Sequence, residues 1–272
     1  MRTLKNFHYQ IYGTQGAKKL VFLHGLMGAG ANWRRIVKPF EADFEILCFD
    51  QRGHGRSFQP ISGYTPQDYA DDLVFLLEEL GWSDPIHLVG HSMGGRNAVM
   101  FAGEYPERLE KLVIEDIGPE ANLSGLERIR GYLEAIPVPF ASKAIAKSYL
   151  NNEFLEYLGG LNPQTKTLSQ YFYTNLTQKE DGSVGWRFSR GGIIESMESA
   201  RYIDWWEIWK NIEVPTLVVR GEHSEELTPE ELDAVSKMGD HYKTETILSS
   251  GHWVHFEQPD RFIQVLKDFF DK

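Results

Sequence analysis

The sequence predicts an α/β protein with a mostly parallel central sheet flanked by helices and interrupted by a helical insertion. Short apolar runs bounded by Gly, Asp or Pro alternate with helical patterns, as in parallel-sheet proteins. This alternation stops between about residues 119 and 211 and resumes at Val214. The chain has 272 residues, of which 42% are hydrophobic and 25% charged, which suits one soluble domain with an insertion.

Seven apolar runs are the expected strands. They cover residues 7–12, 20–23, 44–49, 86–89, 111–115, 216–220 and 244–248. The single cysteine, Cys48, lies in the third of these runs, so we expect it to pack within a strand. With one cysteine, no disulfide can form within the chain.

Two segments have clear helical patterns. In "TPQDYADDLVFLLEELG", Thr65 suits the N-cap, Pro66 the first helical position, and Gly81 the end. A second helix is expected after Pro259. The expected apolar faces of the two helices consist of Tyr69, Leu73, Leu76, Leu77 and Leu80, and of Phe262, Val265, Leu266 and Phe269.

The stretch 119–210 is helix-like, has no convincing strand and is rich in aromatic residues. We predict that it is a helical lid over a site on a core formed by residues 1–118 and 211–272. At its end, "DWWEIW" (residues 204–209) indicates either an apolar pocket or tryptophans that hold the lid on the core. The other aromatic residues of the stretch include Tyr132, Phe140, Tyr149, Phe154, Tyr157, Tyr171, Phe172, Tyr173 and Trp186.

Charge and hydropathy exclude several classes of partner. Acidic residues outnumber basic ones by 39 to 28, for a formal net charge of -11, and no Lys/Arg cluster stands out, so nucleic acid is not an expected partner. No apolar stretch approaches the roughly 18 residues needed to span a bilayer. The first residues lack the apolar run of a signal peptide, so we expect a cytoplasmic protein with no membrane span.

The motif "GHSMG" places Ser92 on a sharp turn between an expected strand and an expected helix. On such a turn the serine backbone is strained, and the residues two before and two after it must be small. The hydroxyl is thereby exposed above the edge of the sheet, next to a helix N-terminus. We therefore predict that Ser92 is a catalytic nucleophile.

A nucleophilic serine needs a base, and His252 in "SSGHWVHFEQPDRF" follows the last expected strand. His255, three residues later, is the other candidate base in this segment. The two histidines form an H-x-x-H motif, but no third metal ligand is near in the sequence, so no metal site is expected. We expect the His91 side chain to be packed beneath the turn, and the His24 side chain to stabilise its own loop. The histidines without a catalytic constellation are His54, His87 and His223.

The third member of a triad must orient the imidazole. Asp116 ends the strand after the nucleophile helix and is the predicted acid. The other usual place is the loop after the following strand, where Ser224 occupies the expected aspartate position. Three carboxylates near it remain alternatives: Glu222, Glu225 and Glu226.

The expected oxyanion hole combines two backbone N–H groups. One belongs to Met93, which follows the nucleophile, and the other to Leu26 in the turn "HGLMG". Glycines around that turn, Gly25, Gly28 and Gly30, allow the backbone to approach a substrate closely.

Five segments together resemble the α/β-hydrolase superfamily: "FLHGLMGAGANW", "CFDQRGHGRS", "LVGHSMGGR", the strand ending in Asp116, and "SGHWVHFEQPDRF". More narrowly, "HGLMG", "GHSMGG", "DIGP", "GWRF" and the serine of "RGEHS" resemble the YbfF-type carboxylesterases, although "DQRGHGRS" has the more general superfamily form. The resemblance implies Ser92 as nucleophile, His252 as base, Asp116 as acid, Leu26 and Met93 as oxyanion donors, and Ser224 as an auxiliary contact near the histidine.

The resemblance implies a serine hydrolase acting on small-molecule carboxylic esters of small or medium acyl chains, with no metal or organic cofactor. Three alternatives stay open. One is the lyase of menaquinone biosynthesis, which "GHSMGGR" with Arg96 also resembles, although Ser224 stands where that lyase would keep an acid. The others are a thioesterase and a small-molecule receptor that keeps the hydrolase fold.

Overall fold

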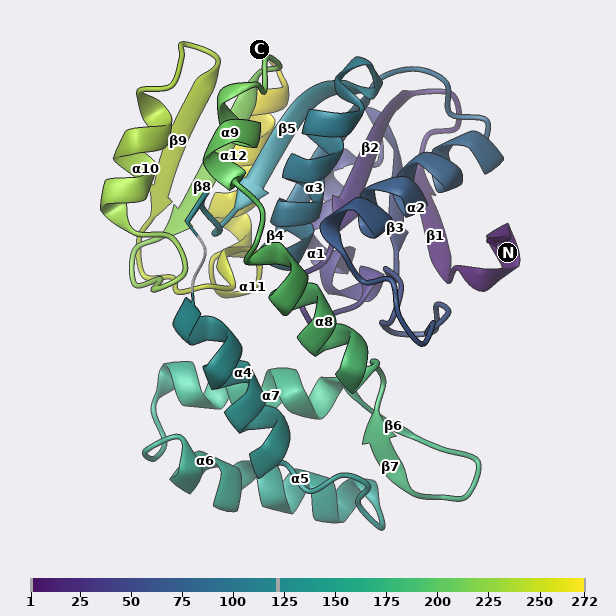
Figure 1. The fold of residues 1–272 in the computed structure, drawn as a ribbon, viewed down its shortest axis with the longest axis vertical. Coiled ribbons are helices and arrows are strands. Elements are labelled where there is room, and N and C mark those ends of the chain that lie inside the picture. The colour runs from purple at the N-terminus through teal and green to yellow at the C-terminus, as the bar shows by residue number, and fades with distance from the viewer. Residues whose placement is uncertain (1, 121–122, 272) are drawn as a thin grey trace.

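The protein is built on a seven-stranded sheet with the strand order β1-β3-β2-β4-β5-β8-β9 (Figure 1). The computed structural model describes residues 2–120 and 123–271. β1 pairs antiparallel with β3, and the other pairs are parallel, so the expected mostly parallel sheet is confirmed. The strands are β1 (Tyr9–Gly13), β2 (Lys18–Leu23), β3 (Phe44–Phe49), β4 (Ile86–His91), β5 (Leu109–Glu115), β8 (Thr216–Gly221) and β9 (Tyr242–Ile247).

Helices cover both faces of this sheet. Buried residues of α2, α3, α9 and α10 form one hydrophobic cluster with one face, and those of α1 and α12 form another with the opposite face. The helices are α1 (Arg34–Val37), α2 (Pro66–Glu79), α3 (Met93–Glu104), α4 (Leu123–Ala135), α5 (Lys143–Asn151), α6 (Glu153–Tyr157), α7 (Pro163–Thr174), α8 (Arg190–Ala200), α9 (Trp205–Lys210), α10 (Pro229–Ser236), α11 (Val254–Glu257) and α12 (Pro259–Phe270). Short 3-10 turns cover Leu4–Asn6, Gly30–Trp33, Lys38–Phe40 and Pro106–Arg108.

Strand β2 shows why the central strands are apolar throughout. Val21 and Leu23 face the first cluster, whereas Leu20 and Phe22 face the second. Successive side chains of a strand point to opposite faces, and both faces of this sheet are buried. Cys48 is buried in β3, as the sequence predicts.

The two helices with clear sequence patterns form as expected. The Thr65 side chain accepts a hydrogen bond from the Asp68 N–H, and Pro66 opens α2. The helix ends at Glu79, with Leu80 as its C-cap, one residue before the predicted Gly81. The second helix, α12, begins at Pro259 and buries its predicted apolar face.

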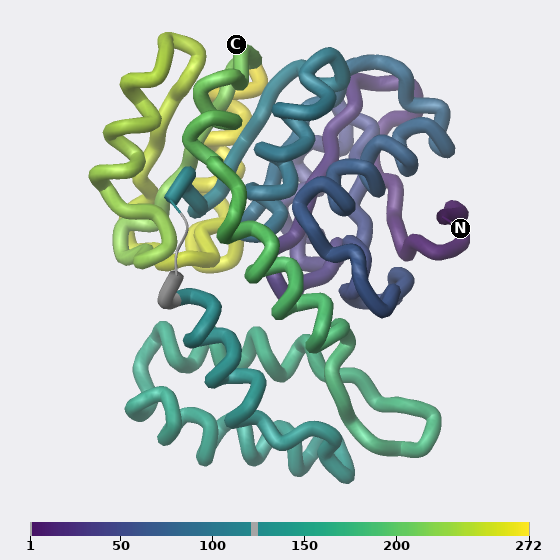
Figure 2. Tube along the Cα trace, viewed as in Figure 1, coloured from purple at the N-terminus to yellow at the C-terminus, as the bar shows by residue number. Residues whose placement is uncertain are grey.

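Helices α4 to α7 form a separate layer at one end of the molecule, and α8 runs from this layer to the core (Figures 1 and 2). We call residues 123–200 the cap segment. It has its own hydrophobic cluster, which includes Phe140, Phe154 and Phe172. The expectation of no strand here is wrong, because β6 (Leu176–Gln178) and β7 (Val184–Trp186) form an antiparallel hairpin. Strands of three residues are too short to show an alternating pattern. That this layer acts as a lid stays a prediction.

The tryptophans of "DWWEIW" pack on the core. Trp205 and Trp209 are buried in the cluster that covers the sheet, and Trp206 Nε1 donates to Glu120 Oε1 at 2.7 Å. None of these three tryptophans is among the described residues that line the cavities beside Ser92. Of the two interpretations of this stretch, core packing is therefore the one that the contacts support.

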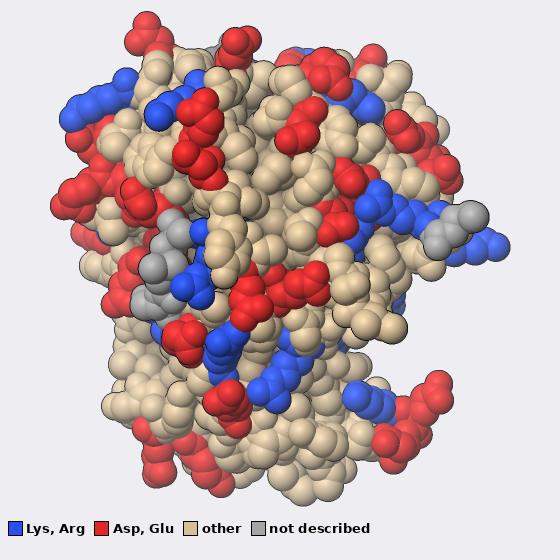
Figure 3. Space-filling view, in the orientation of Figure 1, with Lys and Arg blue, Asp and Glu red and all other residues tan. Residues whose placement is uncertain are grey.

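Acidic and basic side chains are interspersed on the face drawn in Figure 3. In the described part of the chain, no helix is both long and apolar enough to cross a membrane.

His87, in β4, provides a test of the core's response to acid. Its ring lies 5.4 Å from the Phe44 ring and 5.2 Å from the Phe270 ring. Neither ring nitrogen has a hydrogen-bond partner among the described residues, and Glu110 Oε2 lies 3.5 Å from Nδ1. Burial lowers the pKa of His87 to about 4. An unfolded chain takes up a proton near pH 6.5, whereas the folded core does not until about pH 4, so stability should fall as the pH drops between these values.

We expect His87→Leu to reduce this acid sensitivity, because leucine fills the site without a titrating group. Urea unfolding of both proteins at pH 7 and pH 5 measures the difference. An equal loss of stability in both would show that the ring does not stay neutral in the fold.

Candidate active site

The predicted site residues meet at the carboxyl ends of the parallel strands. The chain moves from β2 outward to β3 and then crosses back to β4, so the strand order reverses between β2 and β4. In open α/β sheets, ligands bind at such a switch point. Ser92 follows β4, Asp116 follows β5, and His252 lies between β9 and α11.

Ser92 sits on the strained turn that its motif predicts, with φ 53° and ψ −117°. A Cβ at Gly90 would lie 2.3 Å from the Gly94 oxygen, and a Cβ at Gly94 would lie 2.4 Å from the Leu23 oxygen. Both contacts are impossible for a larger residue, so the glycines permit this backbone. The turn places the serine hydroxyl above the sheet.

Ser92, His252 and Asp116 are joined by two hydrogen bonds. His252 Nε2 lies 2.9 Å from Ser92 Oγ, and His252 Nδ1 lies 2.7 Å from Asp116 Oδ2. With Nδ1–H donating to the carboxylate, Nε2 is the nitrogen that can accept the serine proton. The three residues thus lie in the hydrogen-bonded order that the sequence predicts for them.

Asp116 is held rigidly at the end of β5. Its side chain is fully buried, its N–H donates to Val219 O at 2.8 Å, and its φ is 56°. Its Oδ1 accepts a hydrogen bond from the Gly221 N–H at 2.8 Å, and its Oδ2 accepts a very short one from Ser224 Oγ. The carboxylate is therefore fixed by three partners, including His252.

The three competing glutamates have other partners. Glu222 Oε2 accepts from the Ser249 N–H at 2.8 Å. Glu225 and Glu226 both form ion pairs with Arg128 of α4. Asp116 is thus the carboxylate that hydrogen-bonds His252, and Ser224 contacts this acid rather than the imidazole.

The pKa of His252 reflects two opposing effects. Burial lowers it, but the hydrogen bond and the negative charge of Asp116 outweigh burial and raise the pKa above its ordinary value of 6.5. The imidazole therefore holds a proton more strongly than a free histidine does, which is a property of a base that must accept one.

The two predicted oxyanion donors flank the serine. Met93 is the first residue of α3, where a backbone N–H has no acceptor within the helix. The Leu26 N–H has no hydrogen-bond partner among the described residues, whereas the Leu26 oxygen accepts from the Tyr171 hydroxyl at 2.5 Å. The contact of Tyr171 could not be predicted, because nothing in the sequence pairs residues so far apart.

Ser92 lies at the junction of two cavities. The larger, of about 350 Å³, extends under α4 and α7 and has apolar walls that include Ile129, Tyr132 and Leu168. The smaller, of about 80 Å³, lies beside Met93 and Arg96. A substrate bound at Ser92 thus has room on two sides, and one of them is mainly apolar.

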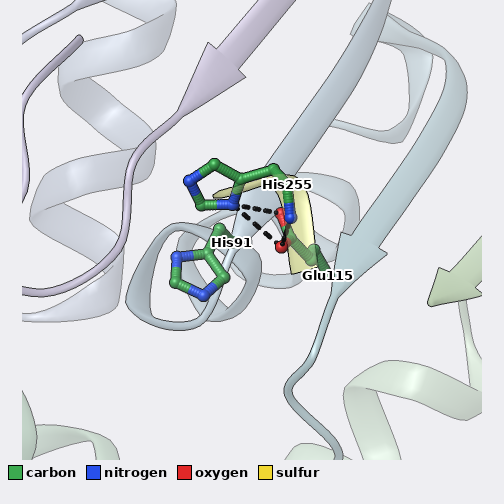
Figure 4. Close-up of side chains that lie close together, drawn as sticks. All are labelled: His91, Glu115 and His255. Carbon is green, nitrogen blue, oxygen red and sulfur yellow. Dashed lines mark hydrogen bonds and ion pairs between the residues drawn. The ribbon is translucent and has the colours of Figure 1, made fainter. Parts of the chain in front are cut away.

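Three further titratable residues cluster beneath the turn (Figure 4). His255 Nδ1 lies 2.8 Å from Glu115 Oε1, and the His255 N–H donates to the same oxygen. His91 Nε2 lies 2.8 Å from the His252 oxygen, so His91 packs beneath the turn as predicted. The expectation that no further ligand lies near His255 is wrong, because His91, Glu115 and His255 offer atoms within 4.8 Å of one another.

The contacts in this cluster are hydrogen bonds within the protein. His255 and Glu115 bond each other, and His91 bonds the backbone of His252. His24 likewise ties its loop together, because its Nδ1 bonds the Gly25 oxygen and its Nε2 accepts from the Gln51 N–H.

The chain is similar to proteins of known family and fold. A family model for the alpha/beta hydrolase fold matches residues 18–259. The sn-1-specific diacylglycerol lipase ABHD11 of Danio rerio is 28% identical over 275 residues, which cover 99% of this chain and 84% of that protein. The 2-(acetamidomethylene)succinate hydrolase of Mesorhizobium japonicum is 26% identical over 252 residues, which cover 93% of this chain and 87% of that protein.

Solved structures agree in fold. A marine microorganism esterase superposes with a TM-score of 0.81 at 27% identity, covering 97% of this chain and 98% of that chain. An E-2-(acetamidomethylene)succinate hydrolase superposes with a TM-score of 0.83 at 23% identity, covering 98% and 95%. The likeness extends over the cap segment as well as the sheet.

Proposed function

The chain belongs to the alpha/beta hydrolase family, and from that premise we propose that it is a serine hydrolase that cleaves carboxylic esters through an acyl-enzyme on Ser92. The observation that carries the proposal is the pair of hydrogen bonds that join His252 to Ser92 and Asp116, 2.9 and 2.7 Å long, in the wall of a cavity. Similarity to an esterase and a lipase supports the same class of reaction.

In the first half of the reaction, Ser92 Oγ attacks the ester carbonyl while its proton passes to His252 Nε2. The carbonyl oxygen becomes negative and is bound by the N–H groups of Met93 and Leu26. The bond to the leaving oxygen then breaks, and His252 gives its proton to the departing alcohol. Asp116 stabilises the imidazolium that exists between these two transfers.

In the second half, water replaces the alcohol. His252 Nε2 takes a proton from the water as the water oxygen attacks the acyl carbon, and the bond to Ser92 Oγ breaks. The proton returns to the serine and the carboxylic acid leaves. The enzyme is restored without any redox step or metal.

The larger cavity supports an acyl chain of small or medium length. Its walls include Ile129, Tyr132 and Leu168, and burial of each methylene contributes roughly 0.8 kcal/mol, about fourfold in kcat/KM. We expect kcat/KM to rise over short acyl chains and then to fall when the cavity is full. Assays on a series of p-nitrophenyl esters measure this directly.

A variant within the cavity sharpens that test. Leu168→Trp should move the best substrate to a shorter chain, because the larger ring takes up volume that the acyl chain would occupy. A monotonic preference for acetyl over every longer chain in the unaltered protein would reject the assignment of this cavity to the acyl group. A parallel series of thioesters and amides tests whether the leaving group must be an alcohol.

The pH dependence of the reaction follows from His252. The base must be neutral to accept the serine proton, and its pKa is raised, so kcat/KM should fall on the acid side with a midpoint above pH 6.5. A pH–rate profile from about pH 5 to 9 checks this. A flat profile across that range, with two different substrates, would argue against a histidine base.

A further inference from the structure

A further cavity, of about 300 Å³, lies between the cap segment and the sheet layer. We call it the second cavity, to distinguish it from the catalytic cavity at Ser92. One wall consists of α7 and Arg187 of the cap segment, and the opposite wall includes Asn32 and His255. Tyr171 and Trp253, whose ring centroids are 5.3 Å apart, line both this cavity and the larger one at Ser92. These two rings therefore separate the second cavity from the catalytic one.

The charge of this cavity is unlike that of the whole chain. The chain has a formal net charge of -11, yet the described residues that line the cavity include an arginine and a histidine and no aspartate or glutamate. The catalytic cavity, by contrast, has Glu225 and Glu226 beside its arginine. The second cavity is thus a place where a negative ligand meets no repelling carboxylate in its walls.

Arg187 is the main cation of the cavity. Its backbone is fixed, because its N–H donates to Asn175 O at 2.9 Å and its oxygen accepts from Gln59 Nε2. Arg187 is partly exposed as a residue, and its guanidinium has no hydrogen bond or ion pair within the described residues, whereas Arg128 and Arg130 of the same layer pair with glutamates. A guanidinium without an internal partner keeps its N–H donors for an anion that enters the cavity.

The facing wall offers polar groups that the protein leaves unused. His255 Nδ1 is taken by Glu115, and its Nε2 has no partner among the described residues. Asn32 Oδ1 accepts from the Ala29 N–H at 2.6 Å, so the Asn32 amide N–H groups remain for a ligand. The rest of the lining includes apolar side chains, among them Ala31 and Phe256.

We propose that this second cavity binds a small aliphatic carboxylate, with its oxygens on Arg187 and Asn32 and its hydrocarbon end against the apolar part of the wall. A guanidinium pairs with a carboxylate through two parallel hydrogen bonds. The apolar lining favours such a ligand over inorganic phosphate, which has no hydrocarbon end. Because the ligand contacts both the cap segment and the sheet layer, it stabilises the attachment of one to the other.

Calorimetric titration of the full-length protein with sodium butyrate tests the proposal, with sodium chloride at equal ionic strength as the blank. Butyrate is also the acid that the proposed hydrolysis of a butyryl ester releases, so the titration uses protein whose Ser92 has first been blocked with a fluorophosphonate. We expect one butyrate site in this protein, and a weakening of at least about tenfold in Arg187→Gln, because its bidentate contact is lost. Arg128→Gln is the matched control, since it removes an arginine from the catalytic cavity instead, and butyrate should bind it as tightly as the unaltered protein.

A second variant keeps the test decisive if Arg187→Gln does not fold. Asn32→Asp retains the acceptor for the Ala29 N–H but places a carboxylate in the wall, so it should also weaken butyrate binding. The absence of butyrate binding to the unaltered protein would overturn the proposal. So would tight binding to the folded variants of Arg187 or Asn32, loss of binding in Arg128→Gln alone, or binding of phosphate in preference to butyrate.

Discussion

Ser92→Ala should lower ester turnover by on the order of 10³-fold or more, because the members of a triad act as a unit and none of the others can replace the nucleophile. The fold should survive, since among the described residues the Ser92 hydroxyl hydrogen-bonds His252 alone and alanine is smaller. The measurement is kcat on the best p-nitrophenyl ester, together with a thermal melt of each protein.

Ser196→Ala is the matched control for that loss. Ser196 lines the smaller cavity beside Ser92, and it has no hydrogen bond to His252 among the described residues. Turnover in this variant should stay close to that of the unaltered protein. If Ser92→Ala kept most of its activity while melting normally, the nucleophile would have to be sought elsewhere in the cavity.

Asp116→Asn should cost on the order of 10²-fold to 10⁴-fold in kcat with little loss of stability. Asparagine tolerates the positive φ of 56° at this position, and its oxygen can still accept from the Gly221 N–H. Its amide nitrogen then faces His252 Nδ1, where a carboxylate oxygen stood. Two donors cannot share that contact, so the imidazole is driven to the tautomer that cannot take the serine proton.

The neighbouring residues supply the controls for Asp116. Glu222→Gln, Glu225→Gln and Glu226→Gln should each cost far less, because their carboxylates bond Ser249 or Arg128 and not His252. The loss of kcat in Ser224→Ala should lie between that of Asp116→Asn and those of the glutamine variants, since the Ser224 hydroxyl donates to Asp116. If kcat stayed near normal in Asp116→Asn but was largely lost in one of the glutamine variants, the acid of the triad would be a glutamate in the loop after β8.

Much of this site could be predicted from the sequence because its parts are local. The glycines around Ser92 are required by the backbone of a single turn, and their spacing is visible in the chain. Asp116 follows a strand that can be recognised in the sequence as an apolar run, and parallel strands bring their carboxyl ends together at one edge of the sheet. The sheet could be predicted for the same reason, since both of its faces are buried and its strands are apolar throughout.

The features that could not be predicted depend on contacts between distant segments. The Tyr171 hydroxyl bonds the Leu26 oxygen across 145 positions, and Glu115 meets His255 across 140. Neither pairing leaves a periodic signal. The hairpin of β6 and β7 was missed because its strands are too short, and the role of Trp205 stayed open because buried aromatic residues look alike in a core and in a pocket.

Intact-mass spectrometry after reaction with a fluorophosphonate tests most directly whether catalysis proceeds through a covalent intermediate on Ser92. We expect a single adduct in the unaltered protein, mapped to the peptide that contains Ser92, and no adduct in Ser92→Ala. A single adduct that persists in Ser92→Ala, or that maps to another residue in the unaltered protein, would contradict it.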